Sequence, residues 1–167
     1  MDTVHLYDDF NGIKEALVRK GFTPTRTQRR LISENPEVTC PVVTPEGLMI
    51  LKLICWADRA RELRSKDAGD IRNLLKTYID TKNINQDIYD DENIRDLENY
   101  GWDLELVACH LLGRHCRDIA STATHSEILK LNNSATSKNI ERIAEEMTEG
   151  TAEENLNMLD AFMNGFT

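Results

Sequence analysis

The strongest constraint on the fold of this chain is an apolar segment that carries a single charge. The run from Leu48 to Trp56 is apolar except for Lys52, and it follows Thr44-Pro-Glu-Gly47. This tetrapeptide is typical of a helix start, because threonine caps well and proline suits the first helical position. The pattern predicts a partly buried helix that runs to about Leu63. Its ammonium group must reach solvent, meet an anionic partner or serve in a cleft, because burying an unpaired charge is costly.

A second helix is predicted after a break at Ser65-Lys66-Asp67. It carries apolar residues at helical spacing, namely Ile71, Leu74, Leu75 and Tyr78. We expect it to pack antiparallel against the first helix, whose facing stripe is predicted to be Leu48, Leu51 and Cys55. Asp67 and Asp70 stand at the start of the second helix, so the lysine of the first helix would face two carboxylates.

The rest of the chain shows helical patterns and one short hairpin. Residues 9–21 are typical of an amphipathic helix, and Gln28–Ser33 and Val38–Val43 of two strands joined by a turn. Further helices are expected at residues 88–99, 103–113, 114–122, 126–131, 138–147 and 152–166. The predicted fold class is mainly α, a helical bundle with a small N-terminal β-hairpin. We expect residues 1–44 to form the N-terminal helix and hairpin, and residues 45–167 to form the bundle.

The composition argues against membrane-spanning and secreted classes of protein. A chain of 167 residues with 40% hydrophobic and 29% charged residues suits one compact domain. No apolar run approaches the roughly 18 residues that span a bilayer. The acidic N-terminus lacks the basic start of a signal peptide, and the four cysteines stand in apolar surroundings typical of reduced thiols. We therefore expect a cytoplasmic protein without membrane contact.

The net charge of −9 is unevenly distributed. Residues 1–83 hold 14 Lys and Arg against 12 Asp and Glu, whereas residues 84–167 hold 6 against 17. The acidic second half argues against a protein-wide surface for nucleic acid. A local basic cleft in the first half stays open, so the sequence leaves nucleic-acid binding undecided.

Cys109-His110 and His115-Cys116 suggest a metal site at first sight. We expect the two histidines to point away from the cysteine face, and Gly113 to end the helix between the two pairs. The spacing also differs from the Cys-x-x-Cys pattern of zinc sites. The sequence has neither a Gly-x-Ser-x-Gly elbow nor a phosphate-binding glycine loop. No metal site is predicted.

Two stretches of the chain resemble a known family. They are Val43-Thr-Pro-Glu-Gly-Leu-Met-Ile-Leu-Lys-Leu-Ile-Cys-Trp-Ala-Asp-Arg59 and Arg64-Ser-Lys-Asp-Ala-Gly-Asp-Ile-Arg-Asn-Leu-Leu75. Both are similar to the helical half of AbiEii-type nucleotidyltransferases. These are DNA polymerase β-like minimal transferases that include the toxins of abortive-infection toxin–antitoxin pairs. The similarity covers about residues 9–120.

The resemblance implies roles for a small set of residues. Lys52 is similar to a nucleotide-phosphate contact, and Asp67 and Asp70 resemble an acidic motif near the active site. The implied catalytic residues are Asp67 and Lys52, and the implied nucleotide-binding residues are Lys52, Arg59, Lys66 and Asp70.

Each of these residues also has a purely structural interpretation. Lys52 would extend along the helix to solvent, and Asp67 would cap the second helix with Asp70 supporting its dipole. Arg59, with its neighbours Arg61 and Arg64, would form a solvated face with helical ion pairs. The sequence leaves both interpretations open.

The departures from the family pattern decide between activity and binding. Such enzymes carry a Gly-Ser motif and a metal-binding Asp-x-Asp pair before the first helix, whereas this chain has no Gly-Ser. If Asp2 is the first acid of that pair, Val4 stands in place of the second. We therefore expect a degenerate protein that acts as a nucleotide- or protein-binding module and needs no cofactor. The alternative is an active minimal nucleotidyltransferase with an RNA or protein acceptor. It would use Mg²⁺ and a nucleoside triphosphate, with acids such as Asp2, Asp8 or Asp9.

The predicted hairpin has consequences for partners. Two strands without further neighbours leave unpaired edges, which tend to pair with another chain. We expect a homodimer or a heteromeric partner through the hairpin region. The acidic C-terminal helices are disfavoured as an interface because like charges repel.

Overall fold

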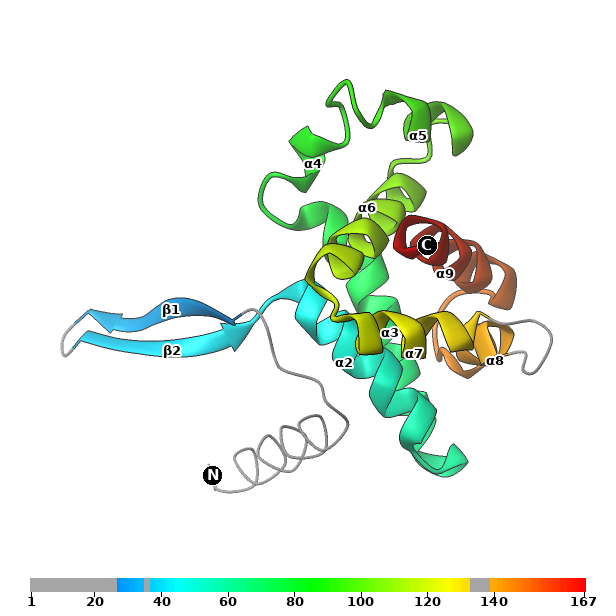
Figure 1. The fold of residues 1–167 in the computed structure, drawn as a ribbon, viewed down its shortest axis with the longest axis horizontal. Coiled ribbons are helices and arrows are strands. Elements are labelled where there is room, and N and C mark those ends of the chain that lie inside the picture. The colour runs from blue at the N-terminus through cyan, green and yellow to red at the C-terminus, as the bar shows by residue number, and fades with distance from the viewer. Residues whose placement is uncertain (1–26, 35–36, 133–138) are drawn as a thin grey trace.

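The computed structural model describes residues 27–34, 37–132 and 139–167, and this part of the chain is mainly helical (Figure 1). The elements are β1 (Thr27–Glu34), β2 (Glu37–Val43), α2 (Pro45–Asp58), η1 (Arg61–Leu63), α3 (Arg64–Thr77), η2 (Tyr78–Asp80), α4 (Ile84–Asp87), α5 (Ile94–Asn99), α6 (Leu104–Ile119), α7 (Thr122–Leu131), α8 (Asn139–Glu146) and α9 (Ala152–Phe166). The predicted mainly α fold class is confirmed. The helix expected at residues 9–21 lies outside the described residues, and the boundary at residue 44 stays a prediction.

The hairpin forms where the sequence places it. Strands β1 and β2 pair antiparallel, from Thr27 opposite Val43 to Glu34 opposite Glu37. Within the described residues the sheet has these two strands alone. Figure 1 shows the hairpin projecting away from the helices. Its outer edges are therefore not covered by the described helices.

Helix α2 begins as predicted and ends earlier. Thr44 Oγ1 accepts a hydrogen bond from the Gly47 N–H at 3.3 Å, and proline follows the cap. The helix ends at Asp58, whereas the sequence suggested about Leu63. The reason is burial, because Trp56 is the last core residue and Leu63 is largely exposed. Continuing the helix would bury nothing further.

Helix α3 packs antiparallel against α2, as predicted. Glu46 of α2 meets Tyr78 beyond the end of α3, and Arg59 meets Asp67 in the first turn of α3. The face that α2 turns to the core differs from the predicted one. The buried residues are Met49, Leu53, Ile54 and Trp56, and the predicted stripe of Leu48, Leu51 and Cys55 is half-buried. A nearly continuous apolar run fixes no unique face, which explains the error.

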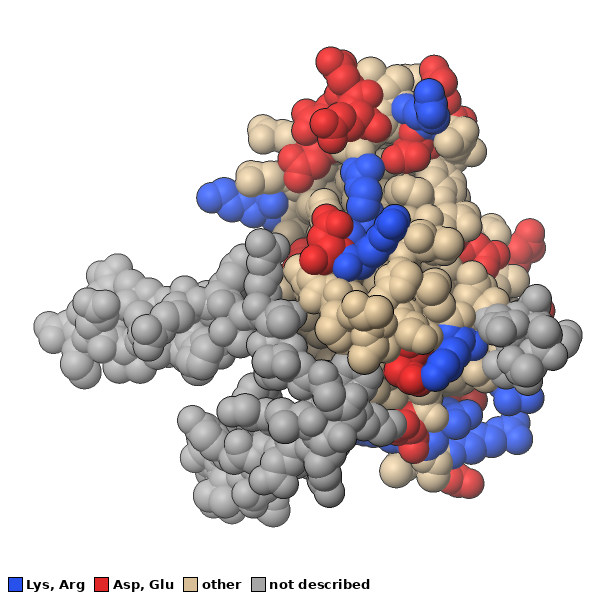
Figure 2. Space-filling view, viewed as in Figure 1, with Lys and Arg blue, Asp and Glu red and all other residues tan. Residues whose placement is uncertain are grey.

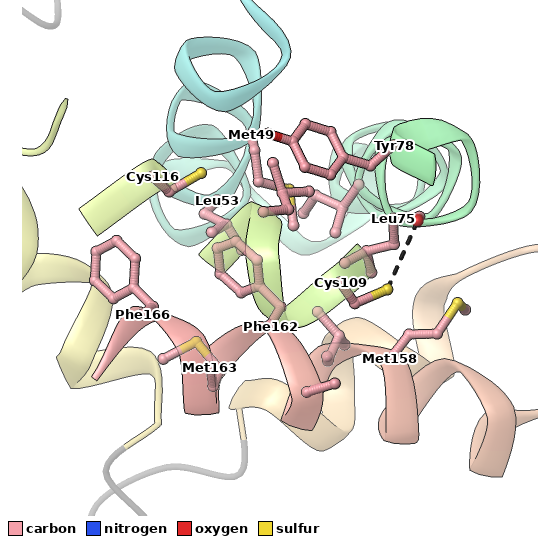
Figure 3. Packing of buried hydrophobic residues seen from close by; sticks show 14 of the residues in the cluster. Met49, Leu53, Leu75, Tyr78, Cys109, Cys116, Met158, Phe162, Met163 and Phe166 are labelled. Atoms are coloured by element: carbon pink, nitrogen blue, oxygen red, sulfur yellow. Dashed lines mark hydrogen bonds between the residues drawn. The ribbon is translucent and has the colours of Figure 1, made fainter. Parts of the chain in front are cut away.

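Helix α6 runs through Gly113 without interruption, so the prediction of two helices there is wrong. A Cβ atom on Gly113 would lie 2.0 Å from the Phe162 carbonyl oxygen, and one on Gly165 would lie 2.0 Å from the His110 carbonyl oxygen. The glycines therefore let α6 and α9 cross at backbone distance. Figure 3 shows Phe162 and Phe166 of α9 within the core that this crossing forms.

The C-terminal helices follow the sequence prediction more closely than the middle of the chain. Helices α8 and α9 lie at the predicted positions, and α7 begins at Thr122, ahead of the predicted Ser126. Of the helix expected at residues 88–99, only the second half forms, as α5, whereas residues 88–93 are turns and α4 lies before the predicted range. The buried Asn93 lies in these turns, where its Nδ2 donates to the Asp87 carbonyl. No helix in the described ranges is long and apolar enough to cross a membrane.

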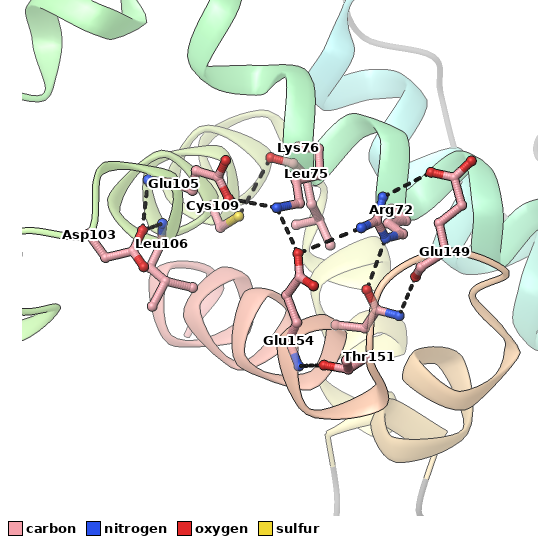
Figure 4. A network of polar contacts seen from close by, with 11 residues as sticks. Arg72, Leu75, Lys76, Asp103, Glu105, Leu106, Cys109, Glu149, Thr151 and Glu154 are labelled. Carbon is pink, nitrogen blue, oxygen red and sulfur yellow. Dashed lines mark hydrogen bonds and ion pairs between the residues drawn. The ribbon is translucent and has the colours of Figure 1, made fainter.

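Polar contacts join α3 to the helices on its far side (Figure 4). Arg72 Nε donates to Asn155 Oδ1 at 3.0 Å, and Lys76 Nζ lies 2.7 Å from carboxylate oxygens of both Glu105 and Glu154. Thr151 caps α9 by accepting from the Glu154 N–H. Helix α3 is therefore fixed on both faces, by α2 on one and by these contacts on the other.

Candidate functional site

Lys52 lies between two carboxylates of the neighbouring helix. Its Nζ is 2.6 Å from Asp70 Oδ2 and donates a hydrogen bond to Asp67 Oδ1 at 3.1 Å. The lysine side chain is 19% exposed, and that of Asp70 is 38% exposed, so the ammonium group stays within reach of solvent. The structure thus brings together the lysine and the two acids that the sequence selected.

Asp67 is the buried anchor of this cluster. Its side chain is fully buried, and Arg59 Nη1 lies 3.1 Å from its second oxygen, Oδ2. The N–H bonds of Arg59 are not directed at that oxygen, so Oδ2 accepts no hydrogen bond among the described residues. Two cations therefore compensate the buried charge while one oxygen keeps an unused acceptor position.

The position of Asp67 overturns the capping interpretation. Helix α3 begins at Arg64 and its N-cap is Leu63, so Asp67 lies inside the first turn and points to α2. The solvated-face interpretation is also wrong for Arg59, because its guanidinium group turns inward to Asp67. Neither role is visible in the sequence, because each depends on how α2 and α3 are placed.

Electrostatics keep the Lys52 ammonium group charged at neutral pH. Burial alone would lower the pKa of Lys52, but hydrogen bonds to Asp70 and Asp67 raise it above its usual value. Burial and the charge of Asp67 raise the pKa of the nearby Cys55 thiol. Lys52 therefore acts as a cation that can bind an anion, and Cys55 stays a neutral thiol rather than a nucleophile.

Lys66 is exposed at the border of the cluster and makes no ion pair with the described residues. It stands one helical turn before Asp70 on α3, so the two residues lie on the same side of that helix. Of the residues selected from the sequence, Lys52, Asp67, Asp70 and Arg59 make direct contacts, whereas Lys66 stands beside them.

The Cys-His pairs of α6 have other partners. Cys109 Sγ donates to the Leu75 carbonyl at 3.6 Å, and Cys116 Sγ to the Glu46 carbonyl at 3.4 Å. His110 and His115 each pair through Nδ1 with a tyrosine hydroxyl. Across residues 27–34, 37–132 and 139–167, no three or more His, Cys, Asp and Glu side chains converge on a common point. Asp2, Asp8 and Asp9 lie outside these ranges.

Sequence reasoning missed the polar partners that hold the ends of α2. Trp56 Nε1 donates to Glu146 Oε2 at 2.7 Å, across 90 residues of sequence. Tyr78 donates to Glu46 Oε1 at 2.8 Å, and burial and Glu46 raise the pKa of this tyrosine. No local pattern marks these pairs, because their members belong to distant segments.

With the geometry in place, comparison with known proteins assigns the family. The family model described as nucleotidyl transferase AbiEii toxin of a type IV toxin–antitoxin system matches residues 18–163. The chain belongs to the AbiEii family. The match spans the Lys52 cluster and continues into α9, beyond the extent of about residue 120 expected from the sequence. No curated protein and no solved structure matches this chain.

Membership in the AbiEii family supports a nucleotidyltransferase-like function. The family is part of a toxin–antitoxin system, which implies a partner component. The roles of Lys52, Asp67 and Asp70 within that function are not settled by the match and belong to the proposal that follows.

Proposed function

We propose that this chain is a degenerate AbiEii-type protein that binds a nucleoside triphosphate at Lys52 and does not complete transfer by itself. The observation that carries the proposal is the placement of Lys52 between a buried and a partly exposed carboxylate. Asp67 fixes the ammonium group, whereas Asp70 can move into solvent. A phosphate oxygen can then replace the Asp70 carboxylate as the anion on Lys52.

The chemistry of the site favours binding over transfer. Phosphoryl-type transfer needs a metal ion that neutralises charge as it develops, and this family pattern places the metal on paired acids after a Gly-Ser motif. The chain has no Gly-Ser, and the carboxylates of the described cluster already compensate Lys52 and Arg59. We accordingly propose that binding needs no resident cofactor.

The second candidate is an active minimal nucleotidyltransferase acting on RNA or protein. It would need Mg²⁺ held by acids outside the described residues, such as Asp2, Asp8 or Asp9, with Lys52 as the phosphate contact. The charged state of Lys52 supports both candidate functions. A measurement of nucleotide transfer to an acceptor distinguishes them, because only the active enzyme transfers.

Calorimetric titration with the four nucleoside triphosphates should reveal saturable binding, and labelled triphosphates with Mg²⁺ should give no transfer to RNA or protein. Lys66→Ala should weaken binding by about threefold to tenfold, because an exposed cation beside Lys52 is lost at no cost to the core. Lys82→Ala removes an exposed lysine on the loop after η2 and should change nothing. Absence of binding would contradict the proposal, and transfer that depends on Lys66 would establish the active alternative.

We further propose that the partner surface is the hairpin, in a homodimer or with another chain. A two-stranded hairpin is marginally stable alone, and β1 and β2 both have an open edge in the described structure. The unpaired thiols of Cys55, Cys109 and Cys116 suit a reducing compartment, which supports a cytoplasmic location.

Light scattering at micromolar concentration should show a species larger than the monomer at both low and high salt. Pairing through backbone hydrogen bonds is less sensitive to salt than pairing of surface charges. Thr39→Pro removes a backbone donor from β2 and should shift the species toward the monomer. A strict monomer at both salt concentrations would refute self-association, leaving only the heteromeric form to be tested by adding the partner component.

A further inference from the structure

A second charged site lies at the opposite end of α2 from the hairpin. A hollow of about 380 Å³ is lined by Arg61 of η1, Arg64 at the start of α3, and three residues of α8, namely Arg142, Glu145 and Glu146. We call these five residues the arginine hollow. Figure 2 shows Lys and Arg side chains gathered at the lower right, over the junction of α2 and α3. The hollow is thus formed by two segments that the sequence separates by about 80 residues.

Arg64 is held in place before any ligand binds. Its Nε donates to the Arg59 carbonyl at 3.0 Å, and its guanidinium carbon lies 4.6 Å from the ring centroid of the buried Trp56. A guanidinium group fixed on an aromatic face loses little conformational freedom on binding. Its two terminal nitrogens donate no hydrogen bond to the described residues, so they can donate to an anion.

Arg61 and Arg142 supply the remaining positive charge. Both side chains are exposed, and neither forms an ion pair within 4.0 Å in the described part of the chain. Both guanidinium groups therefore keep N–H groups that can donate to an anion in the hollow. Guanidinium groups bind phosphate oxygens in a bidentate manner, which makes a phosphoryl group the anion of choice.

The two glutamates restrict the ligand further. Glu146 Oε2 is occupied by the Trp56 indole N–H at 2.7 Å, and Glu145 is exposed at the side of the hollow. Carboxylates repel a bare anion and accept hydrogen bonds from hydroxyl and N–H donors. A ligand that suits both halves carries a phosphate at one end and hydrogen-bond donors at the other, as a nucleoside phosphate does.

We propose that the arginine hollow binds a nucleoside monophosphate unit, with its phosphate on Arg61, Arg64 and Arg142 and its sugar or base donors on Glu145. The unit is either a free nucleotide or the 5′-phosphorylated end of a nucleic acid strand. This site shares no side chain with the Lys52 cluster, although Arg64 donates to the backbone carbonyl of Arg59. The proposal holds whether or not Lys52 binds a triphosphate.

Trp56 provides a direct readout of the hollow. The chain has two tryptophans, and Trp102 is 63% exposed, so Trp102→Phe leaves one buried indole that contacts both Arg64 and Glu146. Movement of either partner changes the emission of this indole. Titration of Trp102→Phe with adenosine monophosphate, without Mg²⁺, should give a saturable change in fluorescence. Adenosine should give none, and inorganic phosphate should bind about tenfold more weakly or worse.

Variants test the proposed roles of the arginines, which would bind the phosphate, and of Glu145, which would bind the sugar or base. Arg142→Ala should weaken binding about tenfold, and Glu145→Gln by a smaller factor, with unchanged melting temperatures because both residues are exposed. Arg117→Ala, an exposed arginine on α6, should leave the titration unchanged. Arg142→Ala should also leave triphosphate binding at Lys52 intact, which keeps the two proposals distinguishable.

The same titration with a 5′-phosphorylated RNA tetranucleotide distinguishes a free nucleotide from the end of a nucleic acid strand. Tighter binding than adenosine monophosphate assigns the hollow to a nucleic acid end, and equal or weaker binding assigns it to a free nucleotide. An unchanged Trp56 signal with every probe would overturn the proposal. So would equal affinity for phosphate and adenosine monophosphate, or binding that Arg142→Ala does not affect.

Discussion

Replacing Gly113 by alanine should lower the free energy of unfolding by about 3 kcal/mol, and the melting temperature by roughly 10 °C. The added Cβ atom would lie 2.0 Å from the Phe162 carbonyl oxygen and 2.9 Å from the Phe166 nitrogen. These are backbone atoms of α9 and cannot rotate away, so the two helices must separate and open the core around Phe162. Thermal and urea unfolding followed by circular dichroism measure the effect. Gly165→Ala should act similarly, because its Cβ would meet the His110 carbonyl oxygen.

Gly69→Ala is the matched control for this prediction. Gly69 also lies within a helix, but its Cβ would be 4.0 Å from Thr148 Oγ1, an ordinary contact. Alanine has the higher helix propensity, so this variant should be more stable by about 0.5–1 kcal/mol. Equal stability of Gly113→Ala and Gly69→Ala would show that α6 and α9 can separate at little cost, contrary to the expected result.

Removing the charge of Asp67 should also destabilise the protein strongly. Asp67→Asn leaves Lys52 and Arg59 without their buried counter-charge, and Lys52→Met leaves a fully buried carboxylate with Arg59 alone. We expect each variant to lose about 2 kcal/mol of unfolding free energy, because each removes the hydrogen bond between the charged groups of Lys52 and the buried Asp67. The double variant should lose less than the sum of the two, with a coupling energy of about 2 kcal/mol.

Urea denaturation of the two single variants and the double variant measures this coupling. The control is the exposed pair of Lys130 and Glu127 on α7, for which the same cycle should give about 0.5 kcal/mol or less. Additive effects at Lys52 and Asp67 would mean that the two charges are independently solvated, and the description of Asp67 as the anchor of Lys52 would then be wrong.

Local signals in the sequence predicted the starts of α2 and α9 correctly. Thr44 caps α2 and Thr151 caps α9 through side-chain oxygens that accept from nearby backbone N–H groups. These interactions span three residues, so the sequence contains all that is needed to recognise them. The hairpin was predicted for the same reason, because alternating residues and a short turn are local features.

Tertiary contacts decided the features that the sequence could not predict. Glycine is common at helix ends, but Gly113 instead allows the close approach of Phe162 on α9, which is 49 residues away in the chain. The buried face of α2 is set by α3 and α6, since an apolar run offers several equivalent faces. Asp67 looked like a cap because its partner Lys52 belongs to another helix.

Only some of the site residues could be selected from the sequence, for the same reason. Lys52, Asp67 and Asp70 could be selected in advance, because one charge in an apolar run and two acids after a break are visible in the sequence. Arg142 and Glu146 could not be selected, since they approach Arg64 only after α8 packs beside α3.

The short junction between the hairpin and α2 couples the orientation of the hairpin to that of the helix. Thr44 is the single residue between β2 and α2, it is 5% exposed, and its side chain caps the helix. If the hairpin changes its orientation, either the backbone dihedrals of Thr44 change and the helix cap breaks, or α2 rotates together with the hairpin as a rigid body. Lys52 lies about two turns from the start of α2. A load applied to the strands is thus transmitted to Lys52 without a flexible hinge between them.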